Sequence, residues 1–232
     1  MEQRACYILS GLGADERVFD QIDFGPFSPV FIPWEPISEG QTLESYAHQL
    51  KAQVTVSNPI LIGISFGGML AQEMSTLLDN CPVLIIASVK TRFELPPFIR
   101  FGGKTGLWKW IPITRSLKNK RLNYWLFGAR TDREKHILDQ ILADSDPVFT
   151  KRAIGMITTW KRRNPVPSPV LQIHGDADHI FKIGNVTPDY IVAGGTHFMT
   201  VSQPEKLSEL IQDALNRLSG TLNDFKDTTK DG

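Results

Sequence analysis

The chain has 232 residues, enough for one domain with a sizeable core, and its 41% hydrophobic and 22% charged residues are ordinary for a globular protein. Basic and acidic residues number 25 each, so the overall charge indicates neither an acidic nor a basic partner. The two cysteines, Cys6 and Cys81, are too few for a disulfide framework or a cysteine metal cluster.

The first residues carry Glu2 and Arg4 before a short apolar run, which does not resemble a signal peptide. No stretch of about 18 apolar residues predicts a membrane-spanning helix. We therefore expect a cytoplasmic protein without a stable membrane anchor, in a compartment that keeps thiols reduced.

Short apolar runs alternate with longer amphipathic segments over residues 1–89 and again over residues 164–218. The short runs predict strands at residues 5–9, 30–33, 59–64, 82–87, 169–174 and 190–192. The longer segments predict helices near residues 15–19, 42–54, 68–78 and 204–218. Alternating strands and helices form βαβ units, so we expect a mostly parallel sheet of about six strands with helices on both faces.

Residues 90–163 interrupt this alternation. They contain prolines at 96, 97 and 112, paired glycines at 102 and 103, and tryptophans at 108, 110 and 125. Helical spacing returns near residues 132–143 and 147–160. We interpret the segment as an inserted helical lid on a core made of residues 1–89 and 164–218. Residues 219–232 are polar and are expected to form a frayed tail.

The sequence Gly63-Ile64-Ser65-Phe66-Gly67 lies where a buried strand meets a helix. A sharp turn at this junction raises the serine above the sheet and crowds the residues two positions before and after it, which must therefore lack side chains. The start of the helix adds free N–H groups and positive dipole character beside the serine. This pattern predicts that Ser65 is a nucleophile.

A serine hydroxyl needs a base, and the base needs an orienting acid. His197 follows the last predicted strand in a glycine-rich loop, at the edge of the sheet where ligand chemistry collects. We interpret it as the base. Asp176 and Asp178 both follow the preceding strand; the Gly-x-x-Asp spacing favours Asp178 as the acid and leaves Asp176 to cap the turn. The same segment offers no set of metal ligands, so we expect neither metal nor cofactor.

The segment Ser10-Gly11-Leu12-Gly13 follows the first predicted strand. Glycines here allow backbone N–H groups to approach a reacting oxygen, and the N–H groups of Leu12 and Phe66 are the candidate oxyanion hole. A plain turn is the alternative interpretation.

These residues together resemble the α/β-hydrolase superfamily, in the chain order nucleophile, acid, histidine, and within it the small esterase-like members. The resemblance implies a three-layer fold with a six-stranded sheet, a catalytic triad of Ser65, Asp178 and His197, and an oxyanion hole at Leu12 and Phe66. Many members carry His-Gly where this chain has Ser10-Gly11. Only 18 residues separate Asp178 from His197, so we expect a truncated connection between the last two strands.

Charge is unevenly spread along the chain. Residues 90–133 hold 11 basic and 2 acidic residues, a net charge of +9, whereas residues 1–88 hold 3 basic and 10 acidic residues, a net charge of −7. Aromatic residues lie among the lid's basic ones. The lid either covers an apolar acyl group and attracts an anionic head group or an anionic lipid surface, or is a solvated basic surface over an ordinary core. No nucleic-acid motif accompanies the basic stretch.

The leading functional hypothesis is a serine hydrolase that cleaves a carboxylic ester or thioester through an acyl-enzyme, with Gly11, Trp108 and Trp125 contacting a small acyl substrate. Acyl transfer, C–C bond hydrolysis and elimination are alternatives that use the same three residues. A non-catalytic ligand-binding protein is a third possibility. The sequence does not indicate an oligomeric state.

Overall fold

The computed structural model describes residues 5–228, with side chains described as far as residue 220. Its centre is a six-stranded sheet in the order β2-β1-β3-β4-β5-β6, and all five pairings are parallel. The strands are β1 (Ala5–Leu9), β2 (Ser28–Phe31), β3 (Ile60–Ile64), β4 (Val83–Ile86), β5 (Val170–Gly175) and β6 (Tyr190–Val192). The predicted parallel sheet is confirmed, with β2 beginning two residues earlier than predicted.

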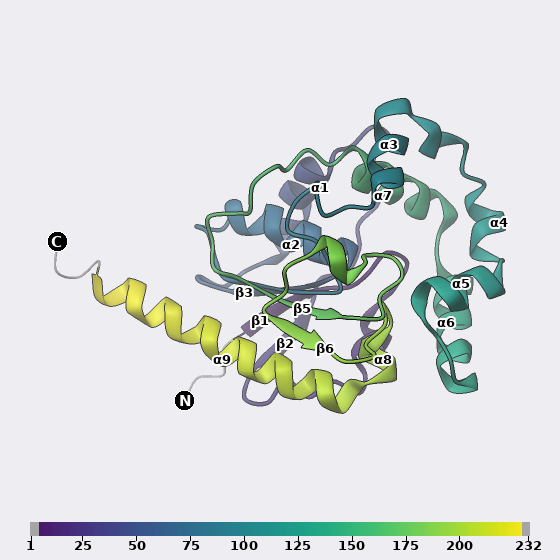
Figure 1. Ribbon diagram of the computed structural model, residues 1–232. Coiled ribbons are helices and arrows are strands. Elements are labelled where there is room, and N and C mark those ends of the chain that lie inside the picture. The colour runs from purple at the N-terminus through teal and green to yellow at the C-terminus, as the bar shows by residue number, and fades with distance from the viewer. Residues whose placement is uncertain (1–4, 229–232) are drawn as a thin grey trace.

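Side chains alternate between the two faces of the sheet, as the period of a strand requires. Tyr7 and Leu9 of β1 face a buried cluster with α1 (Leu43–Leu50) and α2 (Phe66–Thr76). The short helix η2 (Lys51–Gln53) directly follows α1. Cys6 and Ile8 face a second cluster, which includes residues of α9 (Pro204–Thr228). Helices thus cover both faces of the sheet and complete three layers (Figure 1).

Short connections follow several strands of the core. The short helix η1 (Glu16–Phe19) follows the turn after β1, and α8 (Met199–Ser202) follows the loop after β6. Between β5 and β6 the connection contains only η4 (Ile183–Asn185), so it is truncated as the short spacing predicts. These connections bring several loops to the carboxyl edge of the sheet.

Residues 90–163, which the sequence analysis interprets as a lid and which keep that name below, consist of helices that lie beyond this edge of the sheet (Figure 1). They are α3 (Pro97–Thr105), η3 (Leu107–Trp110), α4 (Ile113–Leu117), α5 (Lys120–Phe127), α6 (Asp132–Asp144) and α7 (Pro147–Thr159). A capping box begins α6: Thr131 accepts from the backbone N–H of Glu134, and the Glu134 carboxylate accepts from that of Thr131.

The two ends of the lid are joined where they meet the core. The Arg92 N–H donates to the Arg162 carbonyl oxygen over 2.9 Å. The Arg162 guanidinium donates two hydrogen bonds, of 2.6 and 2.7 Å, to the buried Glu73 carboxylate on α2, and the Trp160 indole donates a third of 2.8 Å. A bidentate arginine–carboxylate pair is directional as well as strong, so it fixes the lid's return segment on the core.

The C-terminal helix is longer than the sequence predicts. The expected tail from residue 219 begins inside α9, which continues to Thr228; residues 229–232 lie outside the described residues. No proline interrupts residues 219–228, and each residue added to an existing helix gains one backbone hydrogen bond.

Cys6 and Cys81 are both buried free thiols, and burial raises the pKa of each to about 12. Among the helices of the described part of the chain, none is long and apolar enough to cross a membrane.

Candidate active site

Ser65 lies in the one-residue turn between β3 and α2. Its backbone has φ 51° and ψ −114°, a left-handed conformation that is strained for a residue with a side chain. The flanking glycines make the turn possible: a Cβ on Gly63 would overlap the backbone of Gly67, and one on Gly67 would overlap the Leu9 carbonyl. The buried Ser88 hydroxyl donates to the Ser65 carbonyl oxygen over 2.6 Å, and this hydrogen bond stabilises the turn.

His197 and Asp178 meet Ser65 from two other loops of the same sheet edge. The Ser65 hydroxyl lies 2.9 Å from Nε2 of His197, and Nδ1 of His197 lies 2.7 Å from Oδ2 of Asp178. An ionised carboxylate only accepts hydrogen bonds. Nδ1 of His197 therefore carries the proton and donates it to Asp178, which leaves Nε2 free to accept from Ser65.

The Asp178 carboxylate is buried, and both of its oxygens accept hydrogen bonds. Oδ1 accepts from the N–H groups of Ile180 and Phe181 over 2.7 and 2.9 Å, while Oδ2 accepts from His197. Burial raises the pKa of Asp178, but the facing charge and N–H of His197 and the Phe181 N–H outweigh it and hold that pKa below its ordinary value. A negative charge is thus fixed behind the histidine.

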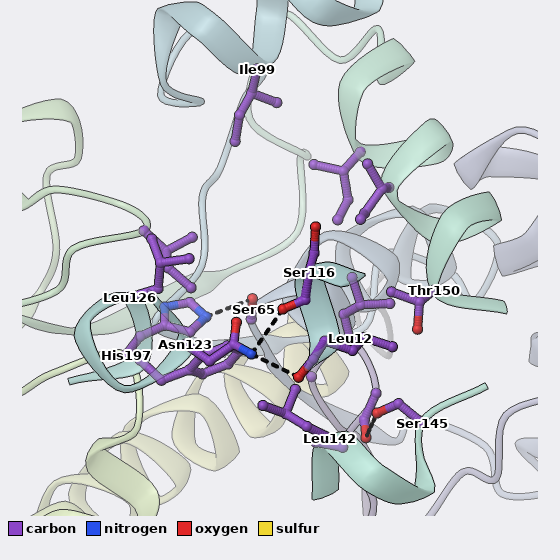
Figure 2. Close-up of a pocket in the computed structure, with 18 of the residues that line it drawn as sticks. Leu12, Ser65, Ile99, Ser116, Asn123, Leu126, Leu142, Ser145, Thr150 and His197 are labelled. Carbon is purple, nitrogen blue, oxygen red and sulfur yellow. Dashed lines mark hydrogen bonds between the residues drawn. The ribbon is translucent and has the colours of Figure 1, made fainter. Parts of the chain in front are cut away.

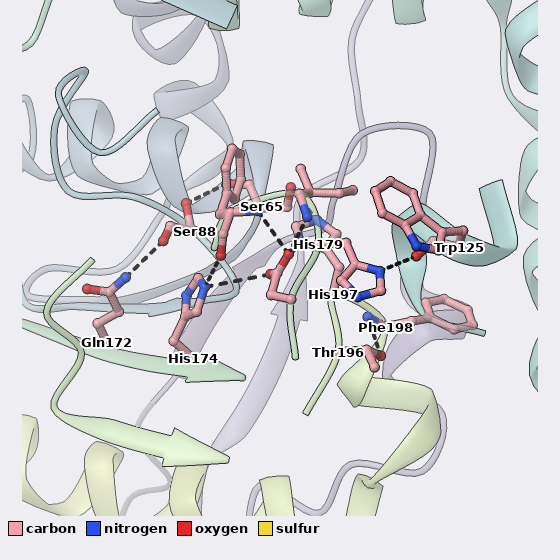
Figure 3. Close-up of polar contacts among 12 residues, drawn as sticks. Ser65, Ser88, Trp125, Gln172, His174, His179, Thr196, His197 and Phe198 are labelled. Carbon is pink, nitrogen blue, oxygen red and sulfur yellow. Dashed lines mark hydrogen bonds and ion pairs between the residues drawn. The ribbon is translucent and has the colours of Figure 1, made fainter. Parts of the chain in front are cut away.

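His174, the penultimate residue of β5, lies beneath this carboxylate. Its Nε2–H donates to the Phe181 carbonyl oxygen over 2.6 Å and lies 3.7 Å from Oδ2 of Asp178 (Figure 3). Burial lowers the pKa of His174 against the opposing effects of Phe181 and Asp178. A neutral His174 therefore supports the loop that carries the acid.

The turn after β1 faces the serine. The Ala14 N–H donates to the Gly11 carbonyl oxygen over 3.0 Å and closes the turn around Leu12. Phe66 is the first residue of α2, where a helix N–H has no acceptor within the helix. Gly11, Leu12 and Ser65 all line one cavity.

This cavity has a volume of about 700 Å³ and lies between the sheet edge and the lid. Figure 2 shows Ser65 and His197 between Ile99 of α3, at the top of the view, and Leu142 of α6, at the bottom. The lining is mostly aliphatic and aromatic. A cavity of this size and lining suits an apolar ligand.

Two lid tryptophans that the sequence singles out lie in different places. Trp108 lines the cavity, and its ring lies against Gly155 of α7, where a Cβ would come within 2.6 Å of it. Trp125 is 57% exposed and is not among the cavity's lining residues. Its ring stacks on His179 with centroids 4.7 Å apart, and Nδ1 of His179 donates to its carbonyl oxygen over 2.6 Å. Trp125 therefore joins the lid to the acid loop.

Asn123 of α5 places a hydrogen-bond acceptor in the cavity lining. Its amide nitrogen donates to the carbonyl oxygens of Ser116 and Leu117 over 3.1 and 3.0 Å, which fixes the orientation of the amide (Figure 2). The amide oxygen has no protein partner among the described residues. It is free to accept from a ligand.

Sequence reasoning did not identify Ser88, Asn123 or His174 as site residues. His174 carried a signal, since it ends a strand two residues before the acid's turn. Ser88 follows β4 at the same edge, whereas the position of Asn123 depends on how the lid packs. No cluster of three or more histidine, cysteine, aspartate or glutamate residues suited to a metal ion occurs among the described residues.

No protein family and no curated protein matches this sequence. Solved structures do match it. An esterase from Thermogutta terrifontis has a TM-score of 0.70 at 12% identity, over 93% of this chain and 90% of that one. A bromoperoxidase from Bacillus anthracis has a TM-score of 0.63 at 19% identity, over 92% of both chains. An enzyme that degrades N-acyl homoserine lactones has a TM-score of 0.66 at 16% identity, over 91% and 93%. At these identities the likeness concerns the fold.

Proposed function

This chain has the α/β-hydrolase fold, and we propose that it is a serine hydrolase that cleaves a carboxylic ester or thioester through an acyl-Ser65 intermediate. One observation carries the proposal: the hydrogen-bonded series from Ser65 through His197 to Asp178, whose hydroxyl end opens into an apolar cavity. A buried carboxylate, a histidine of fixed tautomer and a strained serine turn are a combination suited to nucleophilic catalysis.

The reaction begins with attack of the Ser65 oxygen on the acyl carbon. Nε2 of His197 takes the serine proton, and Asp178 stabilises the imidazolium that forms. The negative oxygen of the tetrahedral intermediate accepts from the N–H groups of Leu12 and Phe66. His197 then protonates the departing alcohol or thiol, the acyl-serine forms, and water activated by the same histidine releases the acid.

The lining of the cavity is evidence that the bound part of the substrate is an apolar acyl group. Its lining offers few polar atoms near Ser65 apart from the Asn123 amide oxygen and the hydroxyls of residues such as Ser116. Two similar solved structures are described as an esterase and as an N-acyl homoserine lactonase. Both descriptions are consistent with hydrolysis of an ester bond.

The test is labelling with a fluorophosphonate probe, read by intact mass. We expect one adduct on the wild-type protein and none on Ser65→Ala. A p-nitrophenyl ester series of increasing acyl length, extended to acyl-CoA thioesters, then measures the acyl preference and separates hydrolysis from the other reactions of the fold. An unlabelled wild-type protein, or equal labelling of Ser65→Ala, refutes the proposal.

A further inference from the structure

The part of the lid formed by α3, η3 and the turn after η3 exposes large apolar side chains around the open side of the cavity. The set that we call the outer lid surface comprises Phe98, Phe101, Leu107, Trp110 and Ile111, from α3, η3 and the turn after η3. Phe98 is 74% exposed and Trp110 is 84% exposed. Single exposed apolar residues are ordinary on protein surfaces, but a group of five within 14 residues indicates an interaction site.

The same part of the lid is strongly basic. Residues 95–131 contain eight basic residues and no acidic one. They are Arg100, Lys104, Lys109, Arg115, Lys118, Lys120, Arg121 and Arg130. Among the described residues only Lys120 of this set has an ion-pair partner, Asp139 at 2.6 Å. The remaining charges are available to an external anion.

We propose that the outer lid surface binds the surface of an anionic lipid bilayer. Tryptophan and phenylalanine insert at the level of the lipid head groups, and lysine and arginine beside them are attracted to anionic lipids. Lys104 and Lys109 are exposed beside Phe101 and Trp110, and the Lys109 ammonium lies 6.0 Å from the Trp108 ring. Exposed aromatic and basic side chains therefore alternate along α3 and η3, which is the composition that a charged lipid surface attracts.

The outer lid surface is continuous with the cavity. Phe98, Phe101, Leu107 and Ile111 are exposed and also line the cavity that contains Ser65. An acyl chain can therefore pass from a bound bilayer into the cavity along apolar side chains. This entry route rests on the proposed function, whereas binding to the bilayer does not.

Binding is measured by flotation of the protein with vesicles of phosphatidylcholine alone and of phosphatidylcholine mixed with phosphatidylglycerol. We expect binding to the anionic vesicles, weakening with added salt, and little binding to the neutral ones. Each basic residue near the surface is worth about fivefold in affinity, so Lys104→Gln with Lys109→Gln is expected to weaken binding roughly 25-fold. Trp110→Ser, which removes the most exposed side chain of the set, is expected to weaken it roughly tenfold.

Matched controls lie far from the lid. Ile191→Ser removes an apolar side chain of 58% exposure from β6, and Lys206→Gln removes an exposed charge from α9; both are expected to bind like the wild type. Trp110, Lys104 and Lys109 do not line the cavity, so their variants are expected to hydrolyse a short soluble ester at the wild-type rate, which shows that they fold.

Bilayer binding and the proposed serine hydrolysis are tested independently, because Ser65→Ala is expected to lose hydrolysis and to bind vesicles like the wild type. Equal binding to neutral and anionic vesicles, or wild-type binding by the Trp110 and lysine variants, overturns the proposal. Concentration-dependent dimerisation that Trp110→Ser abolishes, with no vesicle binding, also overturns it and assigns the outer lid surface to a second copy of the chain.

Discussion

The sheet edge and the lid are built in opposite ways. At the sheet edge β3 and β4 are wholly buried, and the side chains of Asp178 and His197 have hydrogen-bond partners at both of their polar atoms. In the lid α3 has no buried residue, and the outer lid surface faces solvent. Under the proposed function, the core performs the chemistry and the lid selects the substrate. Substitutions in the two regions are expected to change different measurements.

Ser65→Ala is expected to have the largest effect, a loss of activity without a loss of stability. Loss of the attacking oxygen is expected to lower kcat/KM for a p-nitrophenyl ester by about 10⁴-fold or more. Among the described residues the Ser65 hydroxyl hydrogen-bonds to His197 alone, and alanine would adopt the same strained backbone, so the free energy of unfolding is expected to change by less than about 1 kcal/mol. Steady-state kinetics and urea unfolding measure the two quantities. Retained activity would mean that the core does not perform the chemistry through this residue.

Asp178→Asn is the next largest effect. The neutral amide can no longer stabilise the histidine cation or hold its tautomer, so kcat is expected to fall by about 10³- to 10⁴-fold. Asp176→Asn is the matched control, because Asp176 accepts only from the Gly194 N–H over 2.7 Å. The control is expected to retain activity within about threefold. The opposite ranking would assign the acid's role to Asp176.

In the lid, Trp108→Ala tests the selection of substrate. Removing this ring enlarges the cavity, so the preferred acyl chain is expected to lengthen and kcat/KM for short esters to fall by about tenfold. Trp125→Ala, which loses only the stacking on His179, is expected to leave the chain-length profile unchanged. The p-nitrophenyl ester series measures both profiles. A change with Trp125→Ala alone would place the acyl group against that ring instead.

The smallest expected effect concerns the pH dependence of core stability. Burial lowers the pKa of His174 below its unfolded value of about 6.5. As the pH falls through that value, the unfolded chain binds a proton that the folded chain does not, so the free energy of unfolding decreases until the folded-state pKa is reached. One proton contributes a slope of at most about 1.4 kcal/mol per pH unit.

His174→Gln keeps a donor for the Phe181 carbonyl and removes the titration. Its unfolding free energy, measured in urea from pH 8 down to about pH 5, is expected to fall less steeply than that of the wild type. Identical slopes for His174→Gln and the wild type would show that His174 is not kept neutral by folding.

The sequence predicts the core better than the lid, and the reason is local. The glycines two residues before and after Ser65 predict the sharp turn there. His197 and Asp178 each follow a short apolar run that predicts a strand. Their distance from Ser65 then follows from parallel strands ending at one edge. The direction in which Trp125 points depends on contacts with distant residues such as His179, so no local pattern contains it. The length of α9 is a similar case, because a polar composition does not by itself end a helix.

The joined ends of the lid have an evolutionary consequence. Because Arg92 and Arg162 meet across one backbone hydrogen bond, the whole lid leaves and re-enters the core at a single point. Closing a loop whose ends already lie together depends only weakly on its length. Insertions, deletions or exchanges in α3 and η3, where no residue is buried, are therefore expected to alter ligand choice while the sheet and its reactive edge stay unchanged.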